Sequence, residues 1–183
     1  MKKAIGLVEL KSTPIGIQTA DEMVKAANVE LVLANPVCPG KYMIVVSGDV
    51  GAVKNSVERG KSIADVFLVE SHIINNVSPQ VLVAIAGATD IKDLKSIGAI
   101  ETISALTIIK AADIAVKASN VQLIEVRIAK GLGGKGFLIM TGEISSVKSA
   151  IKSCENELAK LGEITSTSII ASPHKSLLEK KVM

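Results

Sequence analysis

Near its start, the chain changes from the apolar pattern of a buried strand to the apolar spacing of a helix. Ala4–Leu10 is a mainly apolar stretch, which is typical of a buried strand. Thr13 followed by Pro14 predicts a helix N-cap with a proline in the first turn. Apolar residues then recur at helical spacing and predict one buried helix face: Ile17, Ala20, Val24 and Ala27.

A hairpin is predicted next. Val29–Ala34 and Tyr42–Ser47 are rich in β-branched residues, which favour strands. The turn between them holds Cys38. Pro36 and Pro39 restrict the backbone of this turn, so the direction of the thiol is fixed at little further entropic cost. Three further elements are predicted: a helix over 50–65, a strand over 67–74 and a short helix or linker over 78–86.

The second half of the chain repeats the first. Lys3–Val29 aligns without a gap on Lys95–Val121, with about 13 of 27 positions identical. Gly40–Lys54 then matches Gly134–Lys148, two residues out of step. The two halves therefore differ in length at the turn that holds Cys38 in the first repeat.

The element order βαββαβ, present twice, predicts the fold class. We expect an α/β (α+β) protein of two ferredoxin-like domains, 1–90 and 91–183. Each domain should have an antiparallel-type sheet flanked by helices.

Composition and charge narrow the classes of function. The longest apolar run, Val81–Ala88, is far shorter than the roughly 18 to 20 residues that cross a bilayer, so we expect no membrane partner. The N-terminal segment has no small-residue cleavage site, which argues against a secretory signal and for a cytoplasmic protein. A dispersed net charge of +3 and an aromatic content of 2% disfavour nucleic acid as a partner.

Candidate catalytic chemistry is sparse. His72 and His174 have no acid, serine or cysteine at a spacing that suggests a triad, so we expect structural histidines and no enzyme. The glycines of GLGGKG, 131–136, precede a predicted strand, whereas a phosphate-binding loop needs a helix N-terminus.

The two cysteines are predicted to differ in role. They are too few for a disulfide scaffold, and in a reducing compartment an accessible thiol favours a reactive or metal-binding role. Cys154 falls on one helical stripe with Val147, Ile151 and Leu158, which predicts a core position. Cys38 is therefore the candidate functional thiol.

Several segments resemble the bacterial microcompartment shell domain. In the first repeat these are IGLVE, ADEMVKAANVELV, GKYMIVVSGDVGAVK and FLVESHII. In the second they are IGAIE, AADIAVKASNVQLI, TGEISSVK and ITSTSIIASPH. Two copies in unpermuted order resemble the trimeric shell proteins whose three chains imitate the hexameric tile of the family. A cysteine in the first turn resembles the iron–sulfur shell proteins of propanediol-utilising compartments.

The resemblance implies positions for the pore and for the tile edge. The turn between the second and third strands lines the pore in single-domain members, which implies pore-lining roles for Pro36, Val37, Pro39 and Gly40 in the first repeat and for Lys130, Gly131, Leu132, Gly133 and Gly134 in the second. The edge lysine of the family matches Lys25 and Lys117. The resemblance also implies a homotrimer in the shell of a cytoplasmic microcompartment, with other shell proteins and a redox enzyme as partners.

For Cys38 the resemblance implies a ligand of an iron–sulfur cluster on the trimer axis. A four-iron cluster needs about four soft ligands, whereas this chain has one cysteine in the turn and no CxxC motif. Because a threefold axis presents one thiol three times, we expect one [4Fe-4S] cluster per trimer. The fourth position would fall to water, a small molecule or a partner's side chain. Two other interpretations stay open: a regulatory module that binds a small metabolite between subunits, and a shell tile with a plain solute pore.

Overall fold

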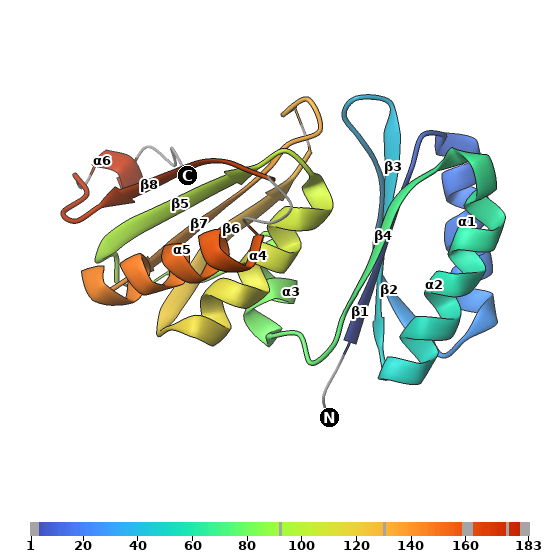
Figure 1. The fold of residues 1–183 in the computed structure, drawn as a ribbon, viewed down its shortest axis with the longest axis horizontal. Helices are drawn as coiled ribbons and strands as arrows, with labels where there is room; N and C mark the ends of the chain where they lie inside the picture. Colours follow the sequence, from blue (N-terminus) through green and yellow to red (C-terminus); the bar gives the residue numbers. More distant parts are fainter. Residues whose placement is uncertain (1–3, 92, 130, 159–162, 175, 180–183) are drawn as a thin grey trace. The chain divides into compact units, whose positions relative to one another are not determined.

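Two four-stranded antiparallel sheets organise the chain, and helices cover each of them (Figure 1). The structure is a computed structural model that describes residues 4–91, 93–129, 131–158, 163–174 and 176–179. The chain divides into two compact units, 1–77 and 78–183.

The first unit has the strand order β2-β3-β1-β4, with antiparallel pairing between all neighbours. Its elements are β1 (Ala4–Leu10), α1 (Thr13–Ala26), β2 (Val29–Val37), β3 (Lys41–Gly48), α2 (Val50–Ala64), η1 (Asp65–Phe67) and β4 (Leu68–Ile74). Figure 1 shows α1 and α2 side by side on one face of this sheet.

The second unit has the equivalent order β6-β7-β5-β8. Its elements are α3 (Pro79–Ile85), β5 (Ser96–Thr102), α4 (Ala105–Ala118), β6 (Val121–Ile128), β7 (Gly136–Gly142), α5 (Ile144–Leu158), β8 (Ile164–Ile170) and α6 (Ser176–Glu179). The predicted fold class, two tandem ferredoxin-like βαββαβ domains, is confirmed. In the described ranges, no helix has the length and apolar character needed to cross a membrane.

The boundary between the units lies earlier than the predicted division of 1–90 and 91–183. Helix α3 packs against β6 and α4, so the segment that follows Val77 belongs with the second unit. The first turn of α3 is also anchored there, because the backbone N–H of Ser78 donates a 2.8 Å hydrogen bond to Asp113 Oδ1 of α4.

Helix α1 begins one residue earlier than the sequence predicted. Ser12, and not Thr13, is the N-cap, and its hydroxyl accepts a 3.4 Å hydrogen bond from the backbone N–H of Ile15. The predicted buried face was also displaced, since Ile17 is 58% exposed. The residues that α1 buries are Gly16, Thr19, Ala20 and Met23. The same spacing predicts a face of Ile109, Ala112 and Val116 in the second repeat. In α4, Ile109 and Ala112 are fully buried and Val116 is half-buried.

The core of the first unit joins the central strands to the two helices. It consists of Ala4, Val8, Leu10, Ala20, Met23, Tyr42, Ile44, Val46, Val53, Val57 and Ala64. In the second unit the stripe Val147, Ile151, Cys154 and Leu158 of α5 is buried as predicted.

A glycine in the first strand of each unit allows the second helix to approach the sheet. A Cβ atom on Gly6 would lie 2.4 Å from Val57 Cγ2, and one on Gly98 would lie 2.6 Å from Val147 Cγ1. Since valine has few alternative rotamers, the helix would have to move away from the sheet to admit a methyl group.

We expect Gly6→Ala and Gly98→Ala each to reduce the free energy of unfolding by about 1 to 3 kcal/mol through overpacking. Gly51→Ala in α2 is the matched control, since nothing lies within 4 Å of a Cβ at this position. The control should be neutral or slightly stabilising, because alanine favours a helix over glycine. Urea unfolding measures all three, and a Gly6→Ala variant as stable as the control would contradict the packing argument.

Candidate functional site

The Cys38 turn closes the hairpin of β2 and β3. The strands remain paired up to Val37 and Lys41, so only Cys38, Pro39 and Gly40 lie outside the ladder. The peptide bond between Cys38 and Pro39 is cis. Gly40 has a φ of 63°, a left-handed conformation that glycine adopts without strain.

The base of this hairpin is fixed to helix α1. The Tyr42 side chain is buried, and its hydroxyl donates a 2.9 Å hydrogen bond to the carbonyl oxygen of Ala34 in β2. The Tyr42 ring lies so close to Gly16 that a Cβ there would be 2.4 Å from ring atoms. Tyr42 therefore holds the base of the hairpin turn to the core.

The two cysteines differ in environment as the sequence predicted. Cys38 is exposed and Cys154 is buried. The Cys154 thiol donates a 3.3 Å hydrogen bond to the carbonyl oxygen of Ala111, and burial raises its pKa to about 12. Since the thiolate is the form that binds metals and reacts, Cys154 stays an inert thiol at neutral pH.

The four first-repeat residues predicted to line a pore fall in two environments. Pro36, Pro39 and Gly40 are exposed, as is Cys38 between them. Val37 is only 5% exposed, so its side chain forms part of the core.

The corresponding turn of the second repeat is longer and rich in left-handed residues. It runs from 129 to 135 between β6 and β7, and Lys130 lies outside the described residues. The backbone N–H of Ala129 donates to the carbonyl of Lys135 at 3.0 Å, which closes the loop at its base. Positive φ angles occur at Gly131, Gly133 and Gly134, so the backbone conformation itself explains the glycines. Leu132 is half-buried in this loop.

The two predicted edge lysines each form an ion pair that sequence reasoning missed. Lys25 pairs with Asp21 and Lys117 pairs with Asp113, in both cases across one helical turn. The Lys25 side chain is 64% exposed and the Lys117 side chain 42% exposed. Asp113 also accepts the Ser78 hydrogen bond, so Lys117 is tied to a more buried anion. The pattern Asp-x-x-x-Lys, present in both repeats, could have predicted these two ion pairs.

A second unpredicted feature is a buried carboxylate near the base of the Cys38 turn. Glu9 in β1 forms a 3.2 Å ion pair with Lys41, and its side chain is only 2% exposed. Among the residues described, Glu9 Oε1 has no hydrogen-bond partner. Burial raises the pKa of Glu9 despite Lys41, and the neighbouring Glu70 raises it further. Glu70 itself lies 2.5 Å from Nε2 of His72.

In the corresponding ion pair of the second repeat, the pKa of the glutamate is shifted in the opposite direction. Glu101 forms a 2.9 Å ion pair with Lys135, and the hydroxyl of Thr165 donates a 2.7 Å hydrogen bond to it. These two hydrogen bonds lower the pKa of Glu101. The opposed strand residue is Ser166 here and Glu70 in the first repeat, so the second acid is missing.

We expect Glu9→Gln and Glu101→Gln to flatten opposite parts of the pH–stability curve. The folded-state pKa of Glu9 lies above its unfolded value of 4.5, so its stabilisation is complete below pH 4.5 and is lost as the pH rises through the raised pKa. The folded-state pKa of Glu101 lies below 4.5, so its stabilisation is present above pH 4.5 and is lost as the pH falls through the lowered pKa.

Melting temperatures of the wild type and both variants, measured from about pH 3 to pH 7, test this. Glu9→Gln should lose less stability than the wild type as the pH rises above 4.5, and Glu101→Gln should lose less as it falls below 4.5. Parallel curves for the three proteins would show that neither carboxyl has the assigned pKa shift.

The structure also shows how the residues that could bind a metal are distributed. Across the described ranges, no three His, Cys, Asp or Glu side chains are grouped as metal ligands would be. Cys38 and its turn are thus one exposed thiol on a short, well-anchored hairpin end.

The chain thus consists of two tandem ferredoxin-like domains that differ in the turn between their second and third strands. Residues 4–77 and 96–173 both match the BMC domain. The chain therefore belongs to the BMC domain family, as a bacterial microcompartment shell protein that carries the domain twice.

Relatives of known name or structure match most of this chain. The bacterial microcompartment shell protein PduT of Citrobacter freundii is 38% identical, over 100% of this chain and 99% of that protein. A crystal structure of a microcompartment protein from Desulfitobacterium hafniense superposes with a TM-score of 0.94 at 44% identity, and covers 98% of this chain and 99% of that one. The carboxysome assembly protein CcmO of Synechocystis is 30% identical over 91% of this chain and 60% of its own length.

Proposed function

We propose that three copies of this chain form a pseudohexameric shell tile whose central axis binds an iron–sulfur cluster through Cys38. The observation that carries the proposal is the single exposed thiol at the tip of a hairpin, in a chain with two copies of the domain. Three chains supply six domains, which is the number needed to imitate a hexamer by closed symmetry. In this arrangement other shell proteins are the neighbours of the tile, in the shell of a compartment in the cytoplasm.

The chemistry of the turn supports a soft-metal ligand. Cys38 is exposed, whereas the other cysteine is buried with a raised pKa, so one thiol per chain is available. Pro39 and Gly40 limit the turn to three residues, which reduces the freedom of the thiol. The backbone N–H groups of Cys38 and Gly40 lie outside the strand ladder, so they suit hydrogen bonds to cluster sulfurs.

The second repeat supports a single ring of three thiols. Its turn carries Leu132 and glycines in place of a cysteine, so six thiols do not compete for one axis. When bound, an iron–sulfur cluster would supply one-electron transfer across the shell, or would be delivered to enzymes inside the compartment. The protein's part is to hold the three thiolates and to leave one position for water, a small molecule or a group from a redox partner.

We expect wild-type protein, purified or reconstituted without oxygen, to contain about one cluster per three chains, because each chain gives one of the ligands. Cys38→Ser should contain none. Cys154→Ala is the matched control and should keep the cluster, since Cys154 is buried in the α5 core. Iron and sulfide analysis together with EPR spectra make the measurement. A Cys38→Ser protein that keeps its cluster contradicts the assignment, and a wild-type trimer that takes up no iron indicates a plain solute pore.

We also expect trimer assembly to survive Cys38→Ser, because subunit surfaces of standard size, and not the cluster, should hold the tile together. Light scattering after size-exclusion chromatography gives the mass of both proteins. Equal trimer masses with and without the substitution agree with the proposal. A monomeric variant would mean that the cluster itself is the main link between chains.

A further inference from the structure

One face of the first unit is exposed, whereas its counterpart in the second unit is covered. This face, the α1–β2 face, includes Asp21 of α1 and Leu31 of the edge strand β2. The Asp21 side chain is 53% exposed and Leu31 is 44% exposed. The equivalent residues of the second repeat, Asp113 and Leu123, are 7% and 1% exposed. Because both sheets have the same strand order, this difference indicates a covering segment that only the second unit has.

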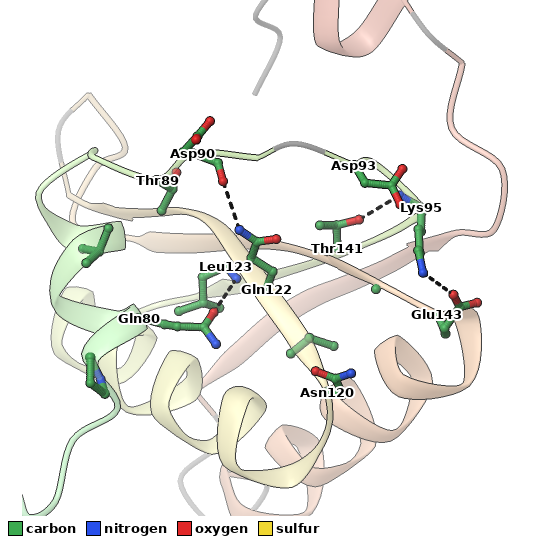
Figure 2. Close-up of a pocket in the computed structure, with 14 residues that line it drawn as sticks. Gln80, Thr89, Asp90, Asp93, Lys95, Asn120, Gln122, Leu123, Thr141 and Glu143 are labelled. Carbon is green, nitrogen blue, oxygen red and sulfur yellow. Dashed lines mark hydrogen bonds and ion pairs between the residues drawn. The ribbon is translucent and has the colours of Figure 1, made fainter.

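Helix α3 provides this cover. It packs against α4 and β6 of the second unit (Figure 1). The backbone N–H of Ser78 donates a 2.8 Å hydrogen bond to Asp113 Oδ1, and Gln80 Oε1 accepts a 3.2 Å hydrogen bond from the backbone N–H of Leu123. Figure 2 shows the second of these bonds, beside a cavity of about 630 Å³. Since α3 follows β4, the last strand of the first repeat, the first repeat supplies the segment that covers the second.

The second repeat is followed by a segment of the same kind. This post-β8 segment, 171–179, includes helix α6, and the structure describes all of it except Lys175. His174 lies four residues beyond β8, as Ser78 lies four residues beyond β4. Within the described ranges, α6 packs against no helix or strand of its own unit as extensively as α3 packs against β6. The post-β8 segment therefore lacks the kind of surface that α3 covers.

The carboxylate of the α1–β2 face can accept the same hydrogen bond as its counterpart. Lys117 pairs with Oδ2 of Asp113, which leaves Oδ1 to accept the bond from Ser78. Lys25 pairs with Oδ2 of Asp21 in the same way. The ion pair within α1 is therefore compatible with a backbone donor at Asp21 Oδ1.

We propose that the post-β8 segment of one chain docks on the α1–β2 face of a second copy of this chain. The backbone N–H of His174 donates to Asp21 Oδ1, and α6 covers Leu31. Leu177, which is half-buried in α6, corresponds to Val81, which is fully buried in α3. Covering Leu31 and Leu177 removes apolar surface from water, which stabilises the contact.

Such a contact is heterologous, because the segment after the second repeat of one chain meets the first repeat of the next. Three contacts of this kind close a ring, so the inference rests on the proposed trimer and names the surfaces that link its chains. It does not involve Cys38, and it holds whether or not a cluster is bound.

Cross-linking between introduced thiols of the full chain tests the docking. Asp21→Cys and His174→Cys are combined in a Cys38→Ser protein, so that a cluster plays no part, and the native protein is treated with a short bismaleimide. We expect covalent dimers and trimers on a denaturing gel, since the equivalent residues of the second unit are joined by a 2.8 Å hydrogen bond. Asn55→Cys combined with His174→Cys is the matched control and should give neither, because Asn55 is exposed on α2 and not on α1 or β2.

A substitution on the α1–β2 face tests the apolar part of the contact. Leu31→Ala should weaken self-association by about tenfold, as expected when most of a leucine side chain is no longer covered. Val50→Ala is the matched control and should leave self-association unchanged, because Val50 is similarly exposed but lies on α2. Sedimentation over a dilution series of each protein makes the measurement.

The outcomes separate this inference from the proposed function. A trimeric mass without cross-linked chains, or Leu31→Ala trimers as stable as the wild type, would overturn the docking and leave the trimeric tile intact. A link between the two thiols of a single chain, which adds no chain to the mass, would also overturn it. Cross-linked trimers, found together with wild-type protein that takes up no iron, would support the docking and contradict the cluster.

Discussion

The antiparallel pairing of the first strand with the third, β1 with β3 in one unit and β5 with β7 in the other, is the constraint on which each unit depends. In the first unit its register places Leu10 opposite Tyr42, and the last pair of the adjoining hairpin is Val37 with Lys41. The β1–β3 register puts Lys41 beside Glu9 and the Tyr42 ring against α1, whereas the β2–β3 register leaves three residues for the turn. A slip of β3 by one residue against β1 would turn each of its side chains to the other face of the sheet and would remove both contacts.

The two repeats keep the same strand order and pairing but differ in the turn between their second and third strands. Both sheets have the same strand order, and both first strands have a glycine under the second helix. The difference in length lies where backbone pairing stops: a three-residue turn with Cys38 in one repeat, and a glycine-rich loop from 129 to 135 in the other. The Glu–Lys pair differs inside the ladder instead, where one strand neighbour, Glu70 or Ser166, accompanies opposite pKa shifts of the paired glutamate.

The fold could be predicted because the spacing of apolar residues and the internal repeat can both be read directly from the sequence. The bounds of β1 and the buried stripe of α5 followed directly from apolar spacing. The start of α1 was misplaced, because Ser12 and Thr13 are adjacent N-cap candidates and the choice depends on a side-chain hydrogen bond. The buried face of α1 was displaced because Gly16 and Thr19, which are not large apolar residues, pack against the core. The Glu9–Lys41 pair and the second-unit cavity were missed, because each joins residues brought together only by strand register or by the connector.

The position of Cys38 makes its proposed chemistry depend on assembly. One exposed thiol per chain is fewer than the roughly four soft ligands that a four-iron cluster needs. In the proposed tile, three thiols around the axis would act at a high effective concentration, so cluster binding would follow trimer formation. A chain that fails to assemble would then hold no redox centre, which limits electron transfer to completed tiles. The anchoring of the turn through Tyr42 suits this order of events, because a hairpin end held to the core before assembly loses little entropy when the axis forms.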